Sequence, residues 1–161
     1  MITLYADYGK FYKVEQGSFP DGTLHLSLPD DYINAVEWRY ESDAELFALI
    51  CIRRHYADCD MNLILPYVPH ARMDRVKDPT DVFTLKYFCE VINSLNFNEV
   101  WVLDVHSNVS LALLDRVSPI PIEQTLNECM KRINRDDIVL FFPDEGAMKR
   151  YSSEFNMPYA F

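Results

Sequence analysis

Apolar and polar residues follow one another along the chain in blocks that predict both strands and helices. Three short apolar runs, at residues 62–67, 99–103 and 137–143, are each followed by charged or polar side chains. Continuous apolar runs of this length between helical patterns are typical of buried parallel strands. Ligands of open α/β sheets bind just beyond the carboxyl ends of the strands, so we expect the side chains that follow these runs to meet at one edge of the sheet. They are Arg72, Asp74, Asp104, His106 and Asp144.

Helical spacing of apolar residues separates the predicted strands. The predicted helices cover residues 42–55, 80–95, 109–114, 121–133 and a segment that begins near 145. Ser42 and Glu45 have the spacing of a capping box, which marks the start of the first helix. Pro121 fits the first turn of the fourth helix. The alternation of strands and helices predicts an α/β fold with a doubly wound, mainly parallel sheet.

The N-terminal third has a different pattern. Residues 2–6 predict a first strand, and a turn-rich loop at 17–22 leads into alternating residues at 24–28 and an extended segment at 35–40. This pattern predicts a small antiparallel hairpin excursion attached to the sheet. With 161 residues, the chain is expected to form a single domain over residues 1–161.

Composition narrows the possible functions. The net charge of −10 argues against nucleic-acid binding, which depends on neutralising backbone phosphates. No apolar stretch approaches the roughly 20 residues that a membrane span needs. The chain has 4 glycines, and neither the GxGxxG nor the GxxxxGK[ST] motif can be written with them. A bound phosphate must therefore be held by side chains, a metal ion or a helix N-terminus.

The 4 cysteines predict the cellular compartment. Cys51, Cys59, Cys89 and Cys129 show no CxxC spacing, and most of them stand among apolar residues. This pattern favours reduced thiols over a disulfide framework, so we expect a cytoplasmic protein.

Five short segments, at residues 19–22, 65–75, 83–86, 103–107 and 143–150, share one resemblance. In this order they are similar to five segments of ribose-phosphate pyrophosphokinases (PRPP synthetases). Those segments read Phe-x-Asp-Gly-Glu, Pro-Tyr-x-x-Tyr-Ala-Arg-Gln-Asp-Arg, Ile-Ser-Ala-Lys, Asp-Leu-His-Ala and Pro-Asp-x-Gly-Gly-x-Lys-Arg. The resemblance covers essentially the whole chain and corresponds to the N-terminal domain of the family with the beginning of the second domain.

The resemblance implies a phosphoribosyltransferase-like fold and a Mg²⁺-dependent reaction. In that reaction the β,γ-diphosphate of ATP is transferred to the anomeric hydroxyl of ribose 5-phosphate, which gives PRPP and AMP for nucleotide biosynthesis. It also implies a homo-oligomer, from dimer to hexamer, in which subunits share the nucleotide site. Neither a nucleic acid nor a membrane is expected as a partner.

Matching positions in the family imply a role for each candidate residue. The resemblance assigns nucleotide binding to Phe19, Asp21, Arg72 and Asp74, magnesium to His106 and Asp144, and support of His106 to Asp104. The guanidinium of Arg72 has the planar fork that suits phosphate oxygens. Mg²⁺ prefers oxygen ligands, which makes Asp144 its natural protein ligand. No residue of this chain is assigned a catalytic role.

The residues by themselves also allow structural roles. Arg72 could form a surface ion pair with Asp74, and His106 could bond to backbone at the end of a strand. Asp144 has the position of a helix N-cap, a role that is compatible with metal binding through its other oxygen. Phe19 could pack inward at a hairpin turn.

The chain also departs from the family. Met73 stands at the position of a glutamine, Thr23 at that of a glutamate, and His70 at that of a tyrosine. The acidic, Gly/Thr-rich loop that binds ribose 5-phosphate has no counterpart here. We therefore expect the C-terminal ribose-5-phosphate domain to be absent from this chain and the isolated chain to be inactive. The alternative hypothesis is a catalytically silent subunit that binds and regulates partner subunits.

Overall fold

The computed structural model describes residues 1–103, 105, 107–133, 137–154 and 158–161. They form two compact units, Met1–Ile120 and Pro121–Phe161. Asp104 and His106, both predicted to be functional, lie outside the described residues.

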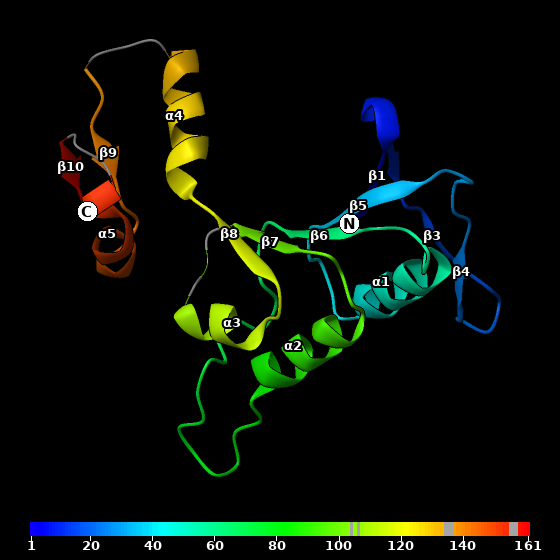
Figure 1. The fold of residues 1–161 in the computed structure, drawn as a ribbon. Helices are drawn as coiled ribbons and strands as arrows, with labels where there is room; N and C mark the ends of the chain where they lie inside the picture. Colours follow the sequence, from blue (N-terminus) through cyan, green and yellow to red (C-terminus); the bar gives the residue numbers. More distant parts are fainter. Residues whose placement is uncertain (104, 106, 134–136, 155–157) are drawn as a thin grey trace. The chain divides into compact units, whose positions relative to one another are not determined.

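The first unit is built on a six-stranded sheet (Figure 1). Its strands are β1 (Ile2–Ala6), β2 (Phe11–Lys13), β5 (Ile33–Trp38), β6 (Asn62–Leu65), β7 (Val100–Leu103) and β8 (Val117–Ile120). Their order in the sheet is β2-β1-β5-β6-β7-β8. The four strands from β5 to β8 are parallel, whereas β1 is antiparallel to both of its neighbours. The prediction of an α/β fold with a mainly parallel sheet is confirmed.

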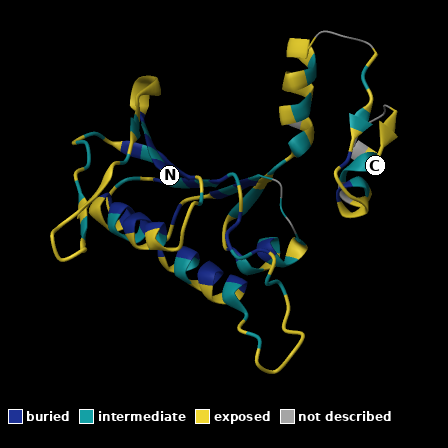
Figure 2. Cartoon of the chain, turned by 180° about the vertical axis from the view of Figure 1, so that it is seen from behind, coloured by how far each residue is buried: buried dark blue, intermediate teal, exposed yellow. Residues whose placement is uncertain are grey.

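Three helices connect the parallel strands: α1 (Ala44–His55), α2 (Thr84–Ser94) and α3 (Asn108–Leu113). They lie on the same face of the sheet (Figure 1), as is usual for right-handed crossovers when the strand order advances in one direction. Within this unit the helices thus cover one face of the sheet, and the second helical layer of the predicted doubly wound arrangement is not seen among its described residues. Strand residues on that face are buried (dark blue in Figure 2): Ile2, Leu4, Val36, Trp38, Leu63, Leu65, Val100 and Val102. On the opposite face, Thr3, Ile64 and Trp101 are partly exposed. The core of this unit therefore lies between the sheet and its helices.

The predicted antiparallel excursion is a short hairpin. It consists of β3 (Gln16–Ser18) and β4 (Leu24–Leu26), which pair with each other and not with the large sheet. Two backbone hydrogen bonds close the turn, from Phe19 N to Thr23 O and from Gly22 N to Phe19 O, each 2.9 Å long. Gly22 has a φ of +83°, a conformation that glycine adopts without steric cost.

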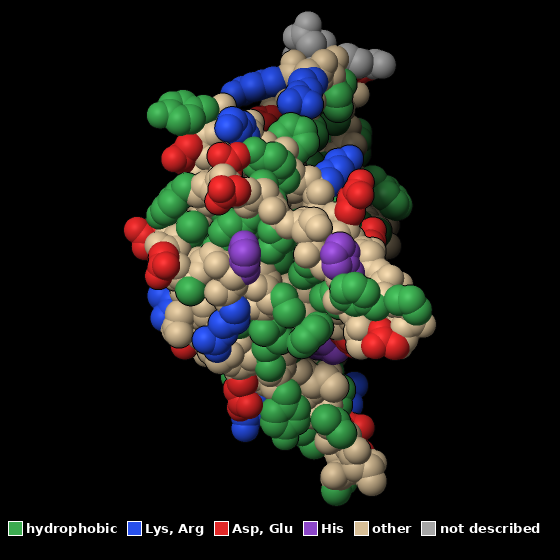
Figure 3. Space-filling model, turned by 90° about the vertical axis from the view of Figure 1, so that its right-hand side faces the viewer, with side chains coloured by type: hydrophobic (Ala, Val, Ile, Leu, Met, Phe, Trp, Pro, Cys, Tyr) green, Lys and Arg blue, Asp and Glu red, His purple; other side chains and the backbone are tan. Residues whose placement is uncertain are grey.

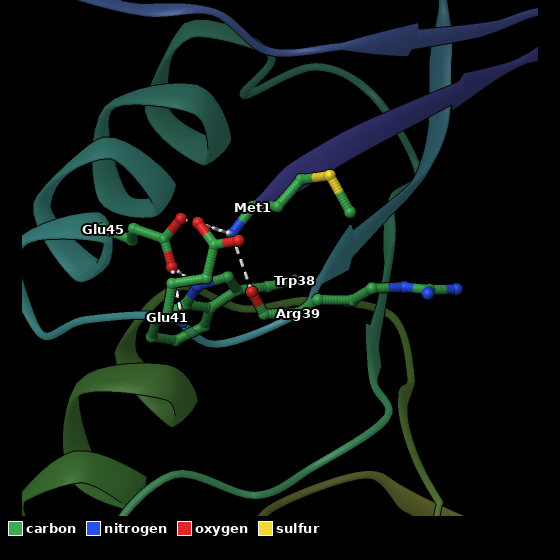
Figure 4. A network of polar contacts seen from close by, with 5 residues as sticks. All are labelled: Met1, Trp38, Arg39, Glu41 and Glu45. Carbon is green, nitrogen blue, oxygen red and sulfur yellow. Dashed lines mark hydrogen bonds and ion pairs between the residues drawn. The ribbon is translucent and has the colours of Figure 1, made fainter.

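The first turn of α1 differs from a simple capping box. The helix begins at Ala44, and the carboxylate of Glu45 accepts hydrogen bonds from Trp38 Nε1 and from the backbone N–H of Glu41, both at 2.9 Å. The ammonium group of Met1 also bonds to Glu45 (Figure 4). Glu45 therefore joins the first strand, the end of β5 and the start of α1.

The second unit contains α4 (Ile122–Ile133), β9 (Leu140–Phe141), α5 (Glu145–Tyr151), a 3₁₀ turn η2 (Ser152–Glu154) and β10 (Tyr159–Ala160). β9 and β10 form a parallel pair. Phe142 is buried, and its ring centroid lies 5.6 Å from that of Tyr159. The helix α4, the strand β9 and the helix α5 follow one another in the predicted order. No helix in the described ranges combines the length and hydropathy needed to cross a bilayer.

Several boundaries differ from the prediction. The hydrophobic pattern predicts neither β2 nor β8, the two edge strands of the large sheet. β8 contains Pro119, which is tolerated at an edge because its missing N–H faces away from the ladder. α2 begins at Thr84 instead of Thr80, because residues 77–81 form a turn in which Asp81 Oδ2 accepts two backbone N–H bonds.

Candidate functional site

The segment between β6 and α2 carries the predicted phosphate-binding arginine. It starts at the carboxyl end of β6 and is anchored by buried Val68 and Ala71. Arg72 follows directly and is exposed. The backbone before it turns sharply, since His70 has a φ of +62°. Local packing thus fixes the loop just before Arg72 and leaves its guanidinium in solvent.

The predicted alternative, an Arg72–Asp74 ion pair, is not formed. Asp74 instead lies beside Arg75, with 3.9 Å between Oδ1 and Nε. Arg72 forms no ion pair with any residue that the structure describes. Its charge is therefore available to an anion from solution.

His70 connects this loop to α1. Its Nε2 lies 3.0 Å from Asp43 Oδ1, and its ring packs near Phe88, at 5.6 Å between centroids, and near Tyr40, at 6.4 Å. These contacts give His70 a packing role at the position where the related family has a tyrosine.

Phe19 and Asp21 stand on the turn of the β3–β4 hairpin. Phe19 is 52% exposed, so the predicted alternative of inward packing is wrong. The inward positions of the hairpin are taken by Leu24 and Leu26, which pack against the core. The aromatic ring of Phe19 is therefore presented to solvent.

Asp21 stabilises its own turn. Its Oδ1 accepts hydrogen bonds from the backbone N–H of Thr23 at 3.0 Å and from the Thr23 hydroxyl at 2.7 Å. These two bonds, the backbone bond first, hold the pKa of Asp21 below its ordinary value. The carboxylate is thus ionised at neutral pH, and Asp21 Oδ2 is the oxygen left to accept a bond from a ligand.

The carboxyl ends of β6 and β7 lie side by side. Leu65 is paired with Val102 in the parallel ladder, so the Arg72 loop and the segment after Leu103 leave the sheet at the same edge. Asp104 and His106 belong to that segment but lie outside the described residues. Their convergence with Arg72 stays a prediction.

Asp144 is the N-cap of α5. It has extended backbone angles, and its Oδ1 accepts a 2.7 Å hydrogen bond from Ala147 N. The side chain is exposed, and its second oxygen has no partner among the described residues. Asp144 belongs to the second unit, so its predicted approach to Arg72 also stays a prediction.

Comparisons with known proteins agree on one group of enzymes. The chain is 23% identical over 163 residues to a ribose-phosphate pyrophosphokinase of Caldanaerobacter subterraneus subsp. tengcongensis, which covers 91% of this chain and 50% of that protein. It is 25% identical over 162 residues to a ribose-phosphate pyrophosphokinase of Sulfurisphaera tokodaii, covering 92% of this chain and 55% of that protein. No family model matches the chain.

A solved structure shares the fold of the chain. The crystal structure of a phosphoribosylpyrophosphate synthetase from Mycobacterium smegmatis superimposes with a TM-score of 0.67 at 16% identity, covering 92% of this chain and 55% of that one. The chain is a divergent relative of the ribose-phosphate pyrophosphokinases. It corresponds to the N-terminal domain and spans about half the length of the curated relatives it matches.

The donor set for magnesium in this pyrophosphokinase-like chain is small. Among the described residues, no three His, Cys, Asp or Glu side chains come together as a metal-binding group. Asp144 nevertheless offers one exposed carboxylate oxygen with no protein partner, while the other oxygen caps α5. Mg²⁺ commonly takes one or two carboxylates and completes its shell with waters and phosphate oxygens. The free oxygen of Asp144 fits that mode of binding.

Because the chain has a net charge of −10, single basic side chains are important for the binding of an anionic ligand. Figure 3 shows acidic and basic side chains interspersed over one face. On this face an anionic ligand would meet individual basic groups and not a continuous basic patch.

Sequence reasoning missed one residue beside the predicted site. His25, on β4, contacts Phe19 edge-to-face, with 5.1 Å between ring centroids. The alternation at residues 24–28 places His25 on the outer face of the hairpin, and this is the sequence signal that could have found it.

Proposed function

We propose that this chain is the ATP-side domain of a ribose-phosphate pyrophosphokinase and that Arg72 binds the phosphates of Mg·ATP. The observation that carries the proposal is that Arg72 is exposed and unpaired among the described residues. It lies in the loop that follows the carboxyl end of β6. The resemblance described above places it at the position of the family's phosphate-binding arginine.

Each remaining candidate has a role that suits its surroundings. Phe19 offers an exposed aromatic face to a purine, and Asp21 offers an acceptor to the amino group of the base. Asp74, beside Arg75, contributes to the nucleotide-binding loop. Asp144 and His106 would hold Mg²⁺, and Asp104 would support His106. When bound, the metal neutralises charge on the phosphates.

The reaction proposed for the complete protein transfers a diphosphate group. The bond between the α-phosphorus of ATP and its bridging oxygen is kept, and the bond between that oxygen and the β-phosphorus breaks. The β-phosphorus bonds to the anomeric oxygen of ribose 5-phosphate, whose hydroxyl proton is released to solvent. AMP leaves and PRPP forms. No residue of these 161 is assigned to ribose 5-phosphate, because none of their segments resembles the sugar-phosphate loop of the family.

Calorimetric titration with Mg·ATP tests the proposal. Arg72→Ala is expected to weaken binding about tenfold to a hundredfold, because a hydrogen bond to a charged group contributes about 1.5–3 kcal/mol. Arg54→Ala, which removes an exposed arginine from α1, is the matched control and should leave binding unchanged. Equal affinities of wild type and Arg72→Ala would show that the nucleotide site is elsewhere.

Asp144→Asn tests the metal role separately from the capping role. Asparagine is as good an N-cap as aspartate, so stability should be kept while the charge is lost. We expect the variant to bind ATP in magnesium no more tightly than the wild type binds it in EDTA. A variant whose magnesium dependence is intact would exclude Asp144 as a ligand.

A silent regulatory subunit is the second candidate. It is favoured by Met73 and Thr23, which stand at two positions of the family's nucleotide site. A silent subunit would bind partner subunits whether or not Arg72 is intact, whereas the first proposal requires ATP binding through Arg72.

Self-association is part of the proposal. The exposed Phe19 is suited to reach a nucleotide held by a second copy of the chain. Sedimentation equilibrium is expected to show dimers or larger assemblies that Mg·ATP strengthens. A strict monomer at high protein concentration, with and without Mg·ATP, would contradict it.

A further inference from the structure

The outer face of the β3–β4 hairpin carries two aromatic rings in contact. The rings of Phe19 and His25 lie 5.1 Å apart between centroids, at an interplanar angle of 79°, which is an edge-to-face arrangement. This geometry is favoured because the positive edge of one ring meets the negative face of the other.

The strand register explains why the two rings meet. His25 is paired across the hairpin with Gly17, which has no side chain. A Cβ at position 17 would lie 3.5 Å from Nδ1 of His25, in ordinary contact. Because Gly17 provides no side-chain neighbour, the ring that His25 contacts on this face is that of Phe19.

The surroundings of His25 are open. The residue is exposed, and it borders a cavity of about 420 Å³ on the same hairpin, together with Lys13, Glu15 and Ser27. Its contact with Phe19 therefore does not belong to the hydrophobic core, which the hairpin reaches through Leu24 and Leu26 on its other face. The two rings therefore contact each other on the exposed face of the hairpin, where the ring of His25 limits the orientations open to the ring of Phe19.

We propose that His25 is a positioning residue for nucleotide binding, which holds the Phe19 ring in the orientation that stacks on the purine base. This inference rests on the proposed function, in which Phe19 is the base contact. A ring held in place before binding loses less conformational freedom when the ligand arrives, so affinity is gained without a contact between His25 and the ligand.

The experiment compares two ligands by calorimetry in magnesium: ATP, which has a base, and inorganic tripolyphosphate, which does not. His25→Ala is expected to weaken ATP binding about threefold to tenfold, in keeping with the strength of a single aromatic pair. Binding of tripolyphosphate should not change. His25→Phe, which keeps a ring beside Phe19, should restore the ATP affinity.

His55→Ala is the matched control. The substitution removes another exposed histidine whose ring contacts an aromatic neighbour, Tyr56, at 4.8 Å between centroids. His55 lies on α1 and not on the hairpin. Both affinities should stay as in the wild type.

The other outcomes separate this inference from the proposed function. If Phe19→Ala weakens ATP binding and His25→Ala does not, the positioning role is wrong and the nucleotide site stands. If His25→Ala weakens ATP and tripolyphosphate equally, the effect is a general loss of structure and the positioning role is wrong. If wild-type protein binds neither ligand, the proposed function fails, and this inference fails with it.

Discussion

The Glu45 carboxylate shows how one residue joins distant parts of the chain. The residue is 6% exposed. Its carboxylate oxygens accept hydrogen bonds from the Trp38 indole N–H, the Glu41 backbone N–H and the ammonium group of Met1 (Figure 4). Burial acts to raise its pKa, but the ammonium, Trp38 and the backbone N–H of Glu41 together lower the pKa below its ordinary value of 4.5. The ionised form is therefore the one that the fold stabilises.

Replacement of Glu45 is expected to destabilise the first unit. Glu45→Ala leaves the buried indole N–H of Trp38 without an acceptor, which costs about 1–3 kcal/mol. Urea denaturation followed by tryptophan fluorescence measures the change. Glu90→Ala, at an exposed position on α2, is the control and should stay within about 0.5 kcal/mol of wild type.

The same carboxylate gives a pH dependence with a definite sign. Because its pKa is lower in the folded state, its contribution is complete above the unfolded value and is lost as the pH falls from about 4.5 through the folded pKa. Glu45→Gln should therefore show a shallower loss of stability between neutral and acidic pH than wild type. An identical slope in the two proteins would contradict the assignment.

At the scale of secondary-structure elements, Arg53 fixes the end of α1 to the end of α2. The side chain is 9% exposed, and its guanidinium donates to the carbonyl oxygens of Tyr56 at 2.9 Å, Ala57 at 3.3 Å and Asn96 at 3.2 Å. The last of these lies just beyond α2, and the guanidinium also stands 5.8 Å from the centroid of the Phe97 ring. A cation among helix-terminal carbonyl groups also opposes the negative end of the helix dipole.

Arg53→Ala is expected to destabilise the protein by about 2–3 kcal/mol, since carbonyl groups lose charge-assisted hydrogen bonds in a buried place. Arg53→Lys should recover only part of this, because an ammonium group lacks the planar fork that reaches several carbonyls. The neighbouring Arg54 is exposed, so Arg54→Ala in the same unfolding assay is a close control. Equal midpoints for both alanine variants would show that the contacts of Arg53 contribute nothing.

At the scale of the whole molecule, the proposed function gives the 161 residues only the ATP side of a site that takes two substrates. These residues match about half the length of the pyrophosphokinases, and no segment of them resembles the loop that binds ribose 5-phosphate. Correct placement of two reactants contributes on the order of 7–11 kcal/mol in favourable cases. The chain by itself should therefore lack most of the rate enhancement.

The expected result is ATP binding without PRPP synthesis. Incubation with ATP, Mg²⁺ and ribose 5-phosphate, followed by chromatography, should show no AMP release above the level found without the sugar phosphate. Sustained AMP release that depends on ribose 5-phosphate and disappears in Asp144→Asn would overturn this prediction and reveal a sugar site within the chain.

The hydrophobic pattern alone was sufficient for the central part of the fold. The predicted runs at 62–67 and 99–103 contain β6 and β7, and helical spacing located α1, α2 and α4 to within a few residues. These elements are predictable because each buries a continuous stripe or face, and burial follows the local periodicity of side chains. The motif segments likewise identified the related family, since that similarity is itself a property of sequence.

Only the tertiary structure decided the features that depend on contacts between distant residues. β2 and β8 exist because a neighbouring strand offers hydrogen bonds, although their own three- and four-residue sequences are too short to show a period. The exposure of Phe19, its contact with His25, and the buried partners of Glu45 and Arg53 are of the same kind. A side chain's neighbours across the fold are set by strand register and helix packing, and these arise only when the whole chain buries its apolar surface together.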